Sequence, residues 1–577
     1  MTSVTVRIAG ANGDGIESSG ALLMKVAAKS GLHVFGYRGY QSIIRGGHVW
    51  YQVRIGDAAL NTHGDTADVL IALNQDAIAN QKSRLSNNAI VIYDPTKVKP
   101  DGLQNNKLIA IPLLDTAIKI SGDPIMRNVI AIGAVLKLLG IDISVFDKVI
   151  EGMFSRKGGS VVADNIKAAS MGYSFGGLST AYSLKSDGIS RYVLDGNTAL
   201  ALGSYSGDCK FYAAYPMTPA SGILHWFAAH ENKGVLYKQT EDEIAAVNMT
   251  IGAASAGVRA MCGTSGGGFS LMVEGLGLAG MLEVPIVIVE SQRTGPSTGL
   301  PTKTEQADLL FVMHASQGEF PRIVVAPRSV EESFYIAKEA FNLAERYQCP
   351  VLILMDLLLS EHAESVNNFN LDFAGIDRGK ISETPAEGRF KRYLLTDDGI
   401  SPRSIPGTAG REFIAGSDEH DEYGDLLSDA FAGLDSSLEM RRKMHSKRMR
   451  KIETMLKSEP LFVPQIEHDD AKHFLVTFGS STGAVREAAE ILKQKGLDFG
   501  LISFNYLMPL DSERTKALLS GKSLIDVECN YTAQLVHVIK ATTGIDIERR
   551  ILRYDGEAIT SSEIAEKALF MLNSHKA

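Results

Sequence analysis

Short apolar runs alternate with helix-length stretches of mixed polarity along most of the chain. The first apolar run covers 4–9, and it is followed by a glycine-rich turn at 10–15 and by a helical pattern that extends to about residue 29. Similar strand-like runs follow at 69–73, 90–93 and 108–111. A further helical stretch follows at 128–139. Alternation of this kind is typical of α/β domains. We therefore expect residues 1–185 to form one α/β domain that ends in a polar linker at 171–190.

The same alternation recurs in two later blocks. Residues 192–363 contain strand-like runs, separated by helical patterns, at 211–214, 259–262, 284–290, 322–326 and 351–355. Residues 466–577 contain further runs at 474–478, 500–504 and 523–528, and a helical pattern at 482–495 that Gly496 closes. The pattern therefore predicts an α/β protein with three α/β domains.

A polar connecting region at 364–465 separates the second block from the third. Residues 417–439 carry eight acidic side chains and no Lys or Arg, whereas 441–451 is strongly basic. We expect a helix at 435–456 whose charged face is solvated. Its inner side would carry Leu438, Met444, Met449, Ile452 and Met455. The alternative for this charged face is a docking surface for a partner.

Composition and charge narrow the function classes. The 577 residues are 45% hydrophobic and 22% charged, which is typical of a globular protein with several cores. The formal net charge of −9 disfavours nucleic-acid binding. The longest apolar stretch, 275–289, is broken by Glu283 and Pro285, so we expect no membrane span. Asp14 and Glu17 stand where a signal peptide would need apolar residues, so we expect a cytoplasmic protein.

The cysteines are too far apart for a local cluster. The chain has four of them, at Cys209, Cys262, Cys349 and Cys529. This spacing excludes a disulfide framework and a Cys-x-x-Cys metal or iron–sulfur motif.

The most specific local motif is Tyr215-Pro216-Met217-Thr218-Pro219, directly after the strand-like run at 211–214. Its two prolines fix the backbone where a strand gives way to a helix, and they hold the Thr218 hydroxyl in place. The alternative is a purely structural turn.

Three acidic residues, Glu241, Asp242 and Glu243, stand at the start of the next helical pattern, with Gly252 nine positions after Glu243. Alternatively, these acidic side chains only stabilise the helix by interacting with the positive end of its dipole at the N-terminus. A glycine-rich loop, Thr264-Ser265-Gly266-Gly267-Gly268 followed by Phe269, comes after the next strand.

Arg293 follows the strand that ends at Glu290, in the Gly- and Pro-rich loop that continues to Thr302. An arginine in such a loop suits bidentate capture of a carboxylate. A surface salt bridge is the alternative.

Taken in order, these motifs resemble the pyrimidine-binding domain of thiamine diphosphate enzymes, and more closely the α subunit of 2-oxoacid:ferredoxin oxidoreductases. Gly267 stands where the family usually has Pro. The resemblance implies a three-layer α/β domain in which catalytic Glu243 holds the pyrimidine N1′ protonated. It further implies that the cofactor lies against Tyr215, Pro216, Met217, Thr218, Glu243 and Phe269. The substrate would be held by Thr218, Arg293 and Thr302.

The two ends of the chain extend the resemblance. Residues 1–185, with Arg45-Gly46-Gly47-His48 before a strand, resemble the family's γ domain, here fused ahead of α; this implies a role in CoA binding, through Ser42 and Arg45. Residues 466–577, with Val476-Thr477-Phe478-Gly479-Ser480 and Glu528-Cys529-Asn530, resemble a transketolase C-terminal-like domain.

Half of a thiamine site is missing from the sequence. Gly13-Asp14-Gly15 has the triplet that binds Mg²⁺ and diphosphate, but the required Asn is absent between Asn12 and Asn61. We therefore expect no metal ligands in this chain. The resemblance implies that a partner β subunit supplies the Mg²⁺–diphosphate half and a [4Fe–4S] cluster, in an (αβ)₂ assembly that passes electrons to ferredoxin.

The resemblance implies oxidative decarboxylation of 2-oxoglutarate with CoA to succinyl-CoA, CO₂ and reduced ferredoxin, or the reverse carboxylation. Pyruvate or branched 2-oxoacids are alternative substrates, and a non-catalytic regulatory or scaffolding subunit is an alternative class. A nucleotide-binding oxidoreductase built on residues 1–30 is disfavoured, because the glycine order does not match Gly-x-Gly-x-x-Gly.

Overall fold

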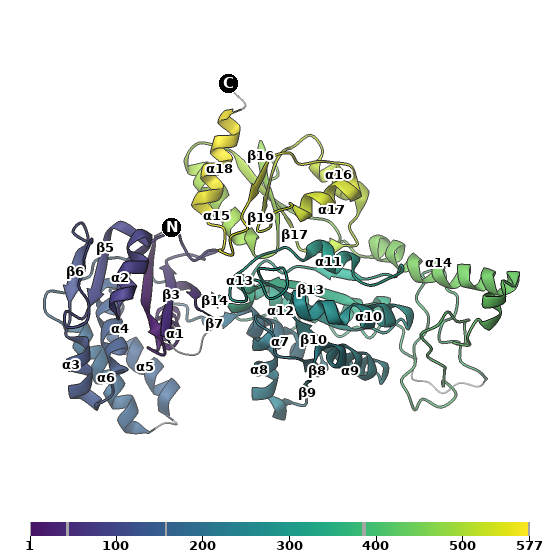
Figure 1. The fold of residues 1–577 in the computed structure, drawn as a ribbon, viewed down its shortest axis with the longest axis horizontal. Coiled ribbons are helices and arrows are strands. Elements are labelled where there is room, and N and C mark those ends of the chain that lie inside the picture. The colour runs from purple at the N-terminus through teal and green to yellow at the C-terminus, as the bar shows by residue number, and fades with distance from the viewer. Residues whose placement is uncertain (1, 42–45, 156–157, 383–387, 575–577) are drawn as a thin grey trace. The chain divides into compact units, whose positions relative to one another are not determined.

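The computed structural model describes residues 2–41, 46–155, 158–382 and 388–574 (Figure 1). The chain divides into two compact units. Unit 1 comprises Met1–Asp195, His362–Asn368 and Thr560–Ser562, and unit 2 comprises Gly196–Glu361, Phe369–Ile559 and Glu563–Ala577. The α/β fold class expected from the sequence is confirmed in both units.

Unit 1 is built on one mixed sheet. In spatial order its strands are β6 (Lys107–Ala110), β5 (Leu85–Tyr93), β4 (Ala67–Ala72), β1 (Ser3–Asn12), β3 (Gly46–Gly56), β2 (His33–Gly39), β14 (Ala363–Val366) and β7 (Tyr192–Asp195). Strand β1 runs parallel to β4 and antiparallel to β3. The four strands expected in this region are present. The short strands β7 and β14, which lie far apart in the sequence, pair with each other at the edge of this sheet.

Helices of unit 1 complete its core. They are α1 (Ile16–Lys29), α2 (Gln75–Gln81), α3 (Leu113–Ser121), α4 (Met126–Leu139), α5 (Ile143–Phe154) and α6 (Gly159–Tyr173). The expected linker at 171–190 is instead part of the unit, because Tyr182 and Leu184 pack against its core. The backbone amides of Ala181 and Tyr182 also donate to the carbonyl of Leu138.

Unit 2 contains a seven-stranded sheet that carries the motifs singled out in the sequence. Its order is β18 (Tyr506–Met508), β12 (Ile323–Val325), β13 (Val351–Asp356), β11 (Val287–Gln292), β10 (Arg259–Thr264), β8 (Cys209–Ala214) and β9 (Leu236–Gln239). All neighbours are parallel except β18, which runs antiparallel to β12. Strands β10, β11 and β13 are buried along their whole length, as expected for a parallel sheet covered on both faces.

Helices cover both faces of this sheet. They are α7 (Gly196–Ser206), α8 (Ser221–Ala229), α9 (Glu243–Ser255), α10 (Gly266–Met281), α11 (Leu309–His314), α12 (Val330–Tyr347) and α13 (Leu357–Glu361). Ala260 and Cys262 of β10 share one core with Met272 of α10. The alternate residue Met261 instead accepts a hydrogen bond from Ser204 of α7. The result is the three-layer α/β arrangement that the resemblance implied.

The C-terminal part of unit 2 is a second, smaller α/β block. Its sheet order is β15 (Gln465–Glu467), β17 (Phe499–Phe504), β16 (His473–Phe478), β19 (Ser523–Glu528) and β20 (Arg550–Leu552). The helices are α15 (Ser481–Gln494), α16 (Ser512–Leu519), α17 (Gln534–Thr543) and α18 (Ser561–Ser574). The expected strands and the expected helix are present. Strand β18, which follows β17 in the chain, leaves this block and joins the seven-stranded sheet.

The connecting region contains the expected long helix, α14 (Asp435–Ser458). Met444 and Met455 are fully buried, as predicted, but Leu438 is exposed. The expected charged face is solvated only in part. Arg441, Lys443 and Glu453 are exposed. Lys447 and Lys451, in contrast, are completely buried. Each lysine Nζ lies 2.6 Å from one carboxylate oxygen of Glu283. A counter-ion far away in the sequence therefore allows a basic helix face to enter the core.

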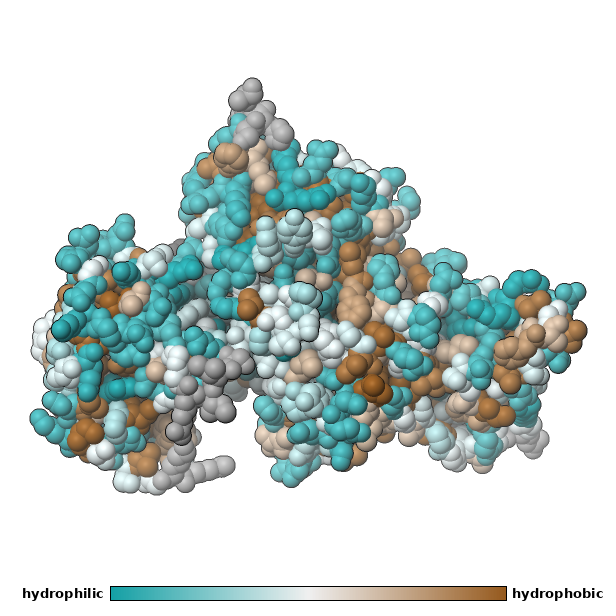
Figure 2. All heavy atoms as spheres, viewed as in Figure 1, coloured by the Kyte–Doolittle hydropathy of each residue, from teal (hydrophilic) through white to brown (hydrophobic). Residues whose placement is uncertain are grey.

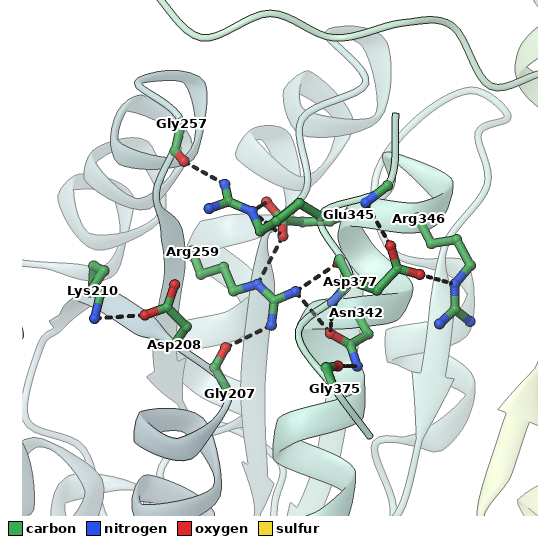
Figure 3. Close-up of polar contacts among 12 residues, drawn as sticks. Gly207, Asp208, Lys210, Gly257, Arg259, Asn342, Glu345, Arg346, Gly375 and Asp377 are labelled. Carbon is green, nitrogen blue, oxygen red and sulfur yellow. Dashed lines mark hydrogen bonds and ion pairs between the residues drawn. The ribbon is translucent and has the colours of Figure 1, made fainter. Parts of the chain in front are cut away.

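A second buried carboxylate holds another part of the connecting region. Glu345 of α12 accepts hydrogen bonds from Arg259 at 2.8 Å and from Arg403 at 2.7 Å, and Arg378 forms a third ion pair with it. Arg259 also donates to the carbonyl oxygens of Gly207 and Asp377 (Figure 3). Three arginines from separate segments therefore converge on one side chain.

We expect Glu283→Gln to lower the free energy of unfolding by about 3–5 kcal/mol, since it leaves buried cations without a counter-charge. Burial by itself raises the pKa of Glu283, but Lys447, Lys451 and Arg392 hold it below the ordinary value. The stabilisation is therefore present above the ordinary glutamate pKa and is lost as the pH falls below it. Denaturant titrations of both proteins between pH 2 and pH 7 measure the difference and its loss in acid.

The matched control is Glu453→Gln on the same helix, where the carboxylate is exposed and pairs with Lys457. Its effect should stay within about 0.5 kcal/mol. Equal effects of the two substitutions would contradict the role assigned to Glu283.

Candidate functional site

The candidate residues gather at the carboxyl edge of the seven-stranded sheet. The motif Tyr215–Pro219 follows β8, the glycine-rich loop follows β10, and Arg293 follows β11. Since β8, β10 and β11 are parallel neighbours, their following loops lie along one edge. This edge is the usual place for ligands in open α/β sheets.

Glu243 is the first residue of α9, and its side chain is buried, with only 2% of the residue exposed. Asp242 caps the helix, because its carboxylate accepts a hydrogen bond from the amide of Ala245 at 2.8 Å. Glu241 is exposed. The helix-terminus role that was the alternative for all three acids therefore describes Asp242, and it does not account for the burial of Glu243.

Three elements hold the carboxylate of Glu243. Thr264 of β10 donates its hydroxyl hydrogen to Oε1 of Glu243 over 3.3 Å. Gly268 of α10 lies so close that a Cβ there would be 2.2 Å from the same oxygen. The Thr264 hydroxyl is also within 3.8 Å of Sδ of Met217, which brings the Tyr215–Pro219 motif to the same place. The structure thus joins three motifs that are distant in the sequence.

The second carboxylate oxygen of Glu243 has no hydrogen-bond donor among the described residues, because every donor that the structure gives this side chain goes to Oε1. The nearby hydroxyl of Ser265 is buried and likewise lacks a partner in the part of the chain that the structure describes. A buried acceptor with one open oxygen can take a hydrogen bond from a ligand. These residues therefore fit a group that presents an N–H to Glu243.

Arg293 connects the β11 loop to the β8 loop. Its guanidinium donates to the carbonyl oxygen of Thr218 at 2.9 Å, and burial lowers its pKa. The loop itself is closed by the amide of Thr294, which donates to the carbonyl of Lys303 at 3.0 Å. Thr302 lies in this loop and is half-buried. Arg293 and Thr218 are therefore in direct contact, and Thr302 lies on the loop that carries Arg293.

The remaining predicted cofactor contacts differ in exposure. Tyr215 is exposed, whereas Pro216 and Met217 are half-buried. The ring of Phe269 has no exposed surface, and it meets Phe311 edge-on at 5.1 Å between ring centres. Phe269 therefore supports the glycine-rich turn from inside the core, and a direct contact with a cofactor stays a prediction.

Ser42 and Arg45, the predicted CoA residues, lie outside the described residues. Among its described residues, unit 1 has a cavity of about 700 Å³, lined in part by the Gly13–Gly15 turn, Arg38 and Trp50. Within that turn Asp14 accepts a hydrogen bond from the amide of Ala11 and pairs with Arg127 at 2.7 Å. Its carboxylate is thus used inside unit 1.

Sequence analysis missed two acidic residues beside the site, Glu290 and Asp308. Glu290 is fully buried in β11, and Asp308 immediately precedes α11. The one sequence signal was Glu290 itself, a charged residue at the end of the otherwise apolar run 284–290.

The described part of the chain contains no candidate metal site. No group of three or more His, Cys, Asp or Glu side chains there could hold an ion. The four cysteines are buried free thiols. Burial raises the pKa of Cys209, Cys262 and Cys349 to about 12 and that of Cys529 to about 11, which makes thiolate formation unfavourable.

In the same described residues, no helix combines the length and the apolar character that crossing a membrane requires.

Comparison with known proteins places these observations in a family. The pyruvate flavodoxin/ferredoxin oxidoreductase thiamine diphosphate-binding family matches residues 202–438, and the pyruvate ferredoxin/flavodoxin oxidoreductase family matches residues 5–175. A relative from Sulfolobus sp., 2-oxoacid:ferredoxin oxidoreductase subunit alpha, is 33% identical over 97% of this chain and 95% of its own length.

A second relative, the 2-oxoglutarate synthase subunit KorA of Methanothermobacter marburgensis, is 33% identical over 66% of this chain and 99% of its own length. Among solved structures, the 2-oxoglutarate:ferredoxin oxidoreductase from Magnetococcus marinus with 2-oxoglutarate, coenzyme A and succinyl-CoA bound is 32% identical. It covers 99% of both chains with a TM-score of 0.91.

The packing of Glu243 can be tested by adding single methyl groups. We expect Gly268→Ala to lower the free energy of unfolding by about 1–3 kcal/mol, because its Cβ would collide with Glu243 and Thr264. Gly267→Ala is the control, since a Cβ there meets nothing within 4 Å. It should raise the free energy of unfolding by about 0.5–1 kcal/mol through helix propensity. Denaturant titration measures both, and equal stabilisation would contradict this packing.

Proposed function

The chain belongs to the alpha subunits of the 2-oxoacid:ferredoxin oxidoreductases, and we propose that it acts on 2-oxoglutarate. The reaction is oxidative decarboxylation with CoA to succinyl-CoA and CO₂, with electrons passed to ferredoxin, or the reverse carboxylation. The observation that carries the proposal is the buried Glu243 carboxylate with one oxygen open to a ligand. Support for the substrate comes from the relatives, since the solved structure from Magnetococcus marinus has 2-oxoglutarate, coenzyme A and succinyl-CoA bound.

Glu243 fits the aminopyrimidine of thiamine diphosphate. When bound, this cofactor supplies a carbon nucleophile and an electron sink for decarboxylation. The open oxygen of Glu243 would accept the N1′ hydrogen and hold that proton in place, while Thr264 fixes the other oxygen. Gly268 leaves the room that the carboxylate needs. This side chain is the catalytic residue of the proposal.

Arg293 is the proposed anchor for the substrate carboxylate. One guanidinium nitrogen already donates to the carbonyl of Thr218, which orients the planar group. The rest of the guanidinium offers further donors for a carboxylate. Thr218 and Thr302 lie on the two loops that Arg293 connects, and they would add hydroxyl donors. Tyr215, Pro216, Met217 and Phe269 complete the proposed cofactor surroundings.

A partner β subunit completes the proposed site. It would carry the Mg²⁺–diphosphate half and a [4Fe–4S] cluster, in a cytoplasmic (αβ)₂ assembly that transfers electrons to ferredoxin. Support comes from the buried, separate thiols and from the paired carboxylate of Asp14. Hydrophobic side chains gather over α9 and α10 (Figure 2), where exposed apolar residues include Ile244, Met249 and Leu271. This face lies around Glu243, and it suits coverage by that subunit.

CoA is the proposed second substrate of the same complex. The cavity of unit 1 beside the Gly13–Gly15 turn supports a place for it, and the assignment of Ser42 and Arg45 remains part of the proposal.

A substrate panel on the co-purified complex tests the proposed function. With CoA and a viologen acceptor, 2-oxoglutarate should give the highest kcat/KM, and pyruvate or branched 2-oxoacids should give lower values. Glu243→Gln should lower turnover by roughly 10²–10⁴-fold, because a neutral amide no longer holds the N1′ proton. Acceptor reduction is followed spectroscopically under anaerobic conditions.

The matched control is Glu241→Gln, which changes an exposed carboxylate two residues away. It should retain turnover close to that of the unsubstituted complex. A higher kcat/KM for pyruvate would refute 2-oxoglutarate as the preferred substrate. Full activity of Glu243→Gln would refute the assignment of Glu243 as the catalytic residue.

Arg293→Lys tests the carboxylate anchor separately. Lysine keeps the positive charge but lacks the planar fork, so KM for the 2-oxoacid should rise roughly tenfold or more. Arg389→Lys, at an exposed ion pair with Asp425, is the control and should leave KM unchanged. Steady-state kinetics of the complex give both values. An unaltered KM and kcat in Arg293→Lys would place carboxylate binding elsewhere.

A further inference from the structure

Glu290 is a carboxyl group deep in the central sheet that the proposed mechanism does not use. It lies on β11 in register with Thr264 of β10, so both side chains leave the same face of the sheet. The residue has no exposed surface. Both of its carboxyl oxygens are buried, and neither has an N–H or O–H donor among the described residues.

Asp308 lies beside Glu290, on the face of β11 that Glu290 shares with Gln292, and the two carboxyl groups are within reach of one hydrogen bond. Its backbone amide donates to the side chain of Gln292 at 2.9 Å, which fixes the residue at the end of β11. Its carboxyl group reaches the first turn of α10, where a Cβ at Gly266 would lie 2.4 Å from Oδ2. Gly266 thus makes room for Asp308 in the way that Gly268 makes room for Glu243.

Helix α10 has an N-terminus that its own N-cap residue leaves incomplete. Ser265 occupies the N-cap position with extended backbone, but its hydroxyl makes no capping hydrogen bond. The N-terminus of a sixteen-residue helix favours a negative charge close to it. Asp308, packed against Gly266, is placed to supply that charge.

Glu290 is buried and Asp308 is half-buried, and two carboxyl groups in such a place are not both ionised at low cost without a cation between them. No ion pair with a Lys, Arg or His side chain is made by Glu290 or Asp308 within the described residues. Burial raises the pKa of Glu290 well above its ordinary value, with Asp308 and Asp356 adding to the rise. Burial also raises the pKa of Asp308, to about 6. Because the pKa of Glu290 is raised further than that of Asp308, Glu290 is protonated and Asp308 is charged at neutral pH.

The third acid nearby, Asp356 of β13, is stabilised as a carboxylate by other donors. Its oxygens accept hydrogen bonds from the side chain of Gln306 at 3.0 Å, from the amide of Leu359 at 2.9 Å and from the hydroxyl of Ser480. These donors satisfy the oxygens of Asp356 without Glu290, and the electrostatic effect of Asp356 raises the pKa of Glu290 further.

We infer that Glu290 and Asp308 share one proton and act together as positioning residues for Glu243. Glu290 stays neutral and donates its O–H to Asp308. The Asp308 carboxylate holds the first turn of α10 through Gly266, and that turn presents Gly268 to Glu243. The catalytic part of this inference rests on the proposed function, whereas the shared proton does not.

Infrared spectroscopy of the purified full-length chain tests the shared proton without any activity. At pH 7 the difference spectrum of the unsubstituted chain minus Glu290→Gln should show the C=O stretching band of a buried protonated carboxylic acid. Burial also raises the pKa of Asp526 and Glu528, but their bands cancel in this difference. The same difference taken with Asp372→Asn, at a residue outside the pair, should show no such band. Absence of the band from the Glu290→Gln difference would overturn the inference.

Kinetics of the complex with its partner subunit test the positioning role. Asp308→Asn should lower kcat about tenfold with KM for the 2-oxoacid within about twofold. It should also remove from the pH profile of kcat the acid limb near pH 6 that protonation of Asp308 produces. An unaltered pH profile in Asp308→Asn would overturn the positioning role.

Two substitutions at Glu290 separate hydrogen bonding from folding. Glu290→Leu removes the donor to Asp308 and should lower kcat about as much as Asp308→Asn does. Glu290→Gln offers an amide N–H in its place and should rescue most of that loss, with both variants checked by thermal unfolding. Equal loss in both would overturn the inference. If no 2-oxoacid is oxidised by any complex, the proposed function fails, while the infrared result still decides the shared proton.

Discussion

The first turn of α10 lacks side chains at Gly266 and Gly268, and the carboxyl groups of Asp308 and Glu243 occupy the space that Cβ atoms would take. Most features of the candidate site depend on this close approach. It allows Glu243 to sit at the start of α9 with Thr264 on one oxygen, and it lets Asp308 approach a helix end that has no side-chain cap. Burying a carboxyl group is costly unless its charge is neutralised or its oxygens are hydrogen-bonded. The glycines therefore make the site possible, and the neighbouring donors and helix dipole make it stable.

Much of the fold was predictable because parallel strands covered on both faces are apolar along their whole length, as in β11 and β13. The strands that escaped prediction include β2, an interior strand of unit 1, and several short strands. β7 and β14 have four residues each, and their place depends on pairing between segments that are far apart in the chain. Such pairing leaves little trace in a local pattern. The polar stretch at 171–190 was misread for the same reason, since Tyr182 and Leu184 pack on a core formed by distant residues.

The candidate site was predictable to a different degree at each residue. Spacing to Gly252 selected Glu243 from three neighbouring acids, and the structure buries that residue while Asp242 caps the helix. Arg293 and Thr218 were predicted from separate motifs, yet only the structure shows that one donates to the carbonyl of the other. The charged helix α14 was misread because Lys447 and Lys451 have the spacing of a solvated face. Their counter-ion, Glu283, is more than 160 residues away, and no local rule connects them.

Strand β18 has a consequence for how the protein can be divided. It belongs by sequence to the C-terminal block, but it hydrogen-bonds to β12 at the edge of the seven-stranded sheet. A fragment truncated before residue 466 would lose that strand and present β12 as an open edge. Exposed edges of this kind template pairing with other chains and lead to aggregation. Gene fission or domain shuffling at this boundary is therefore disfavoured, although the two blocks have separate sheets.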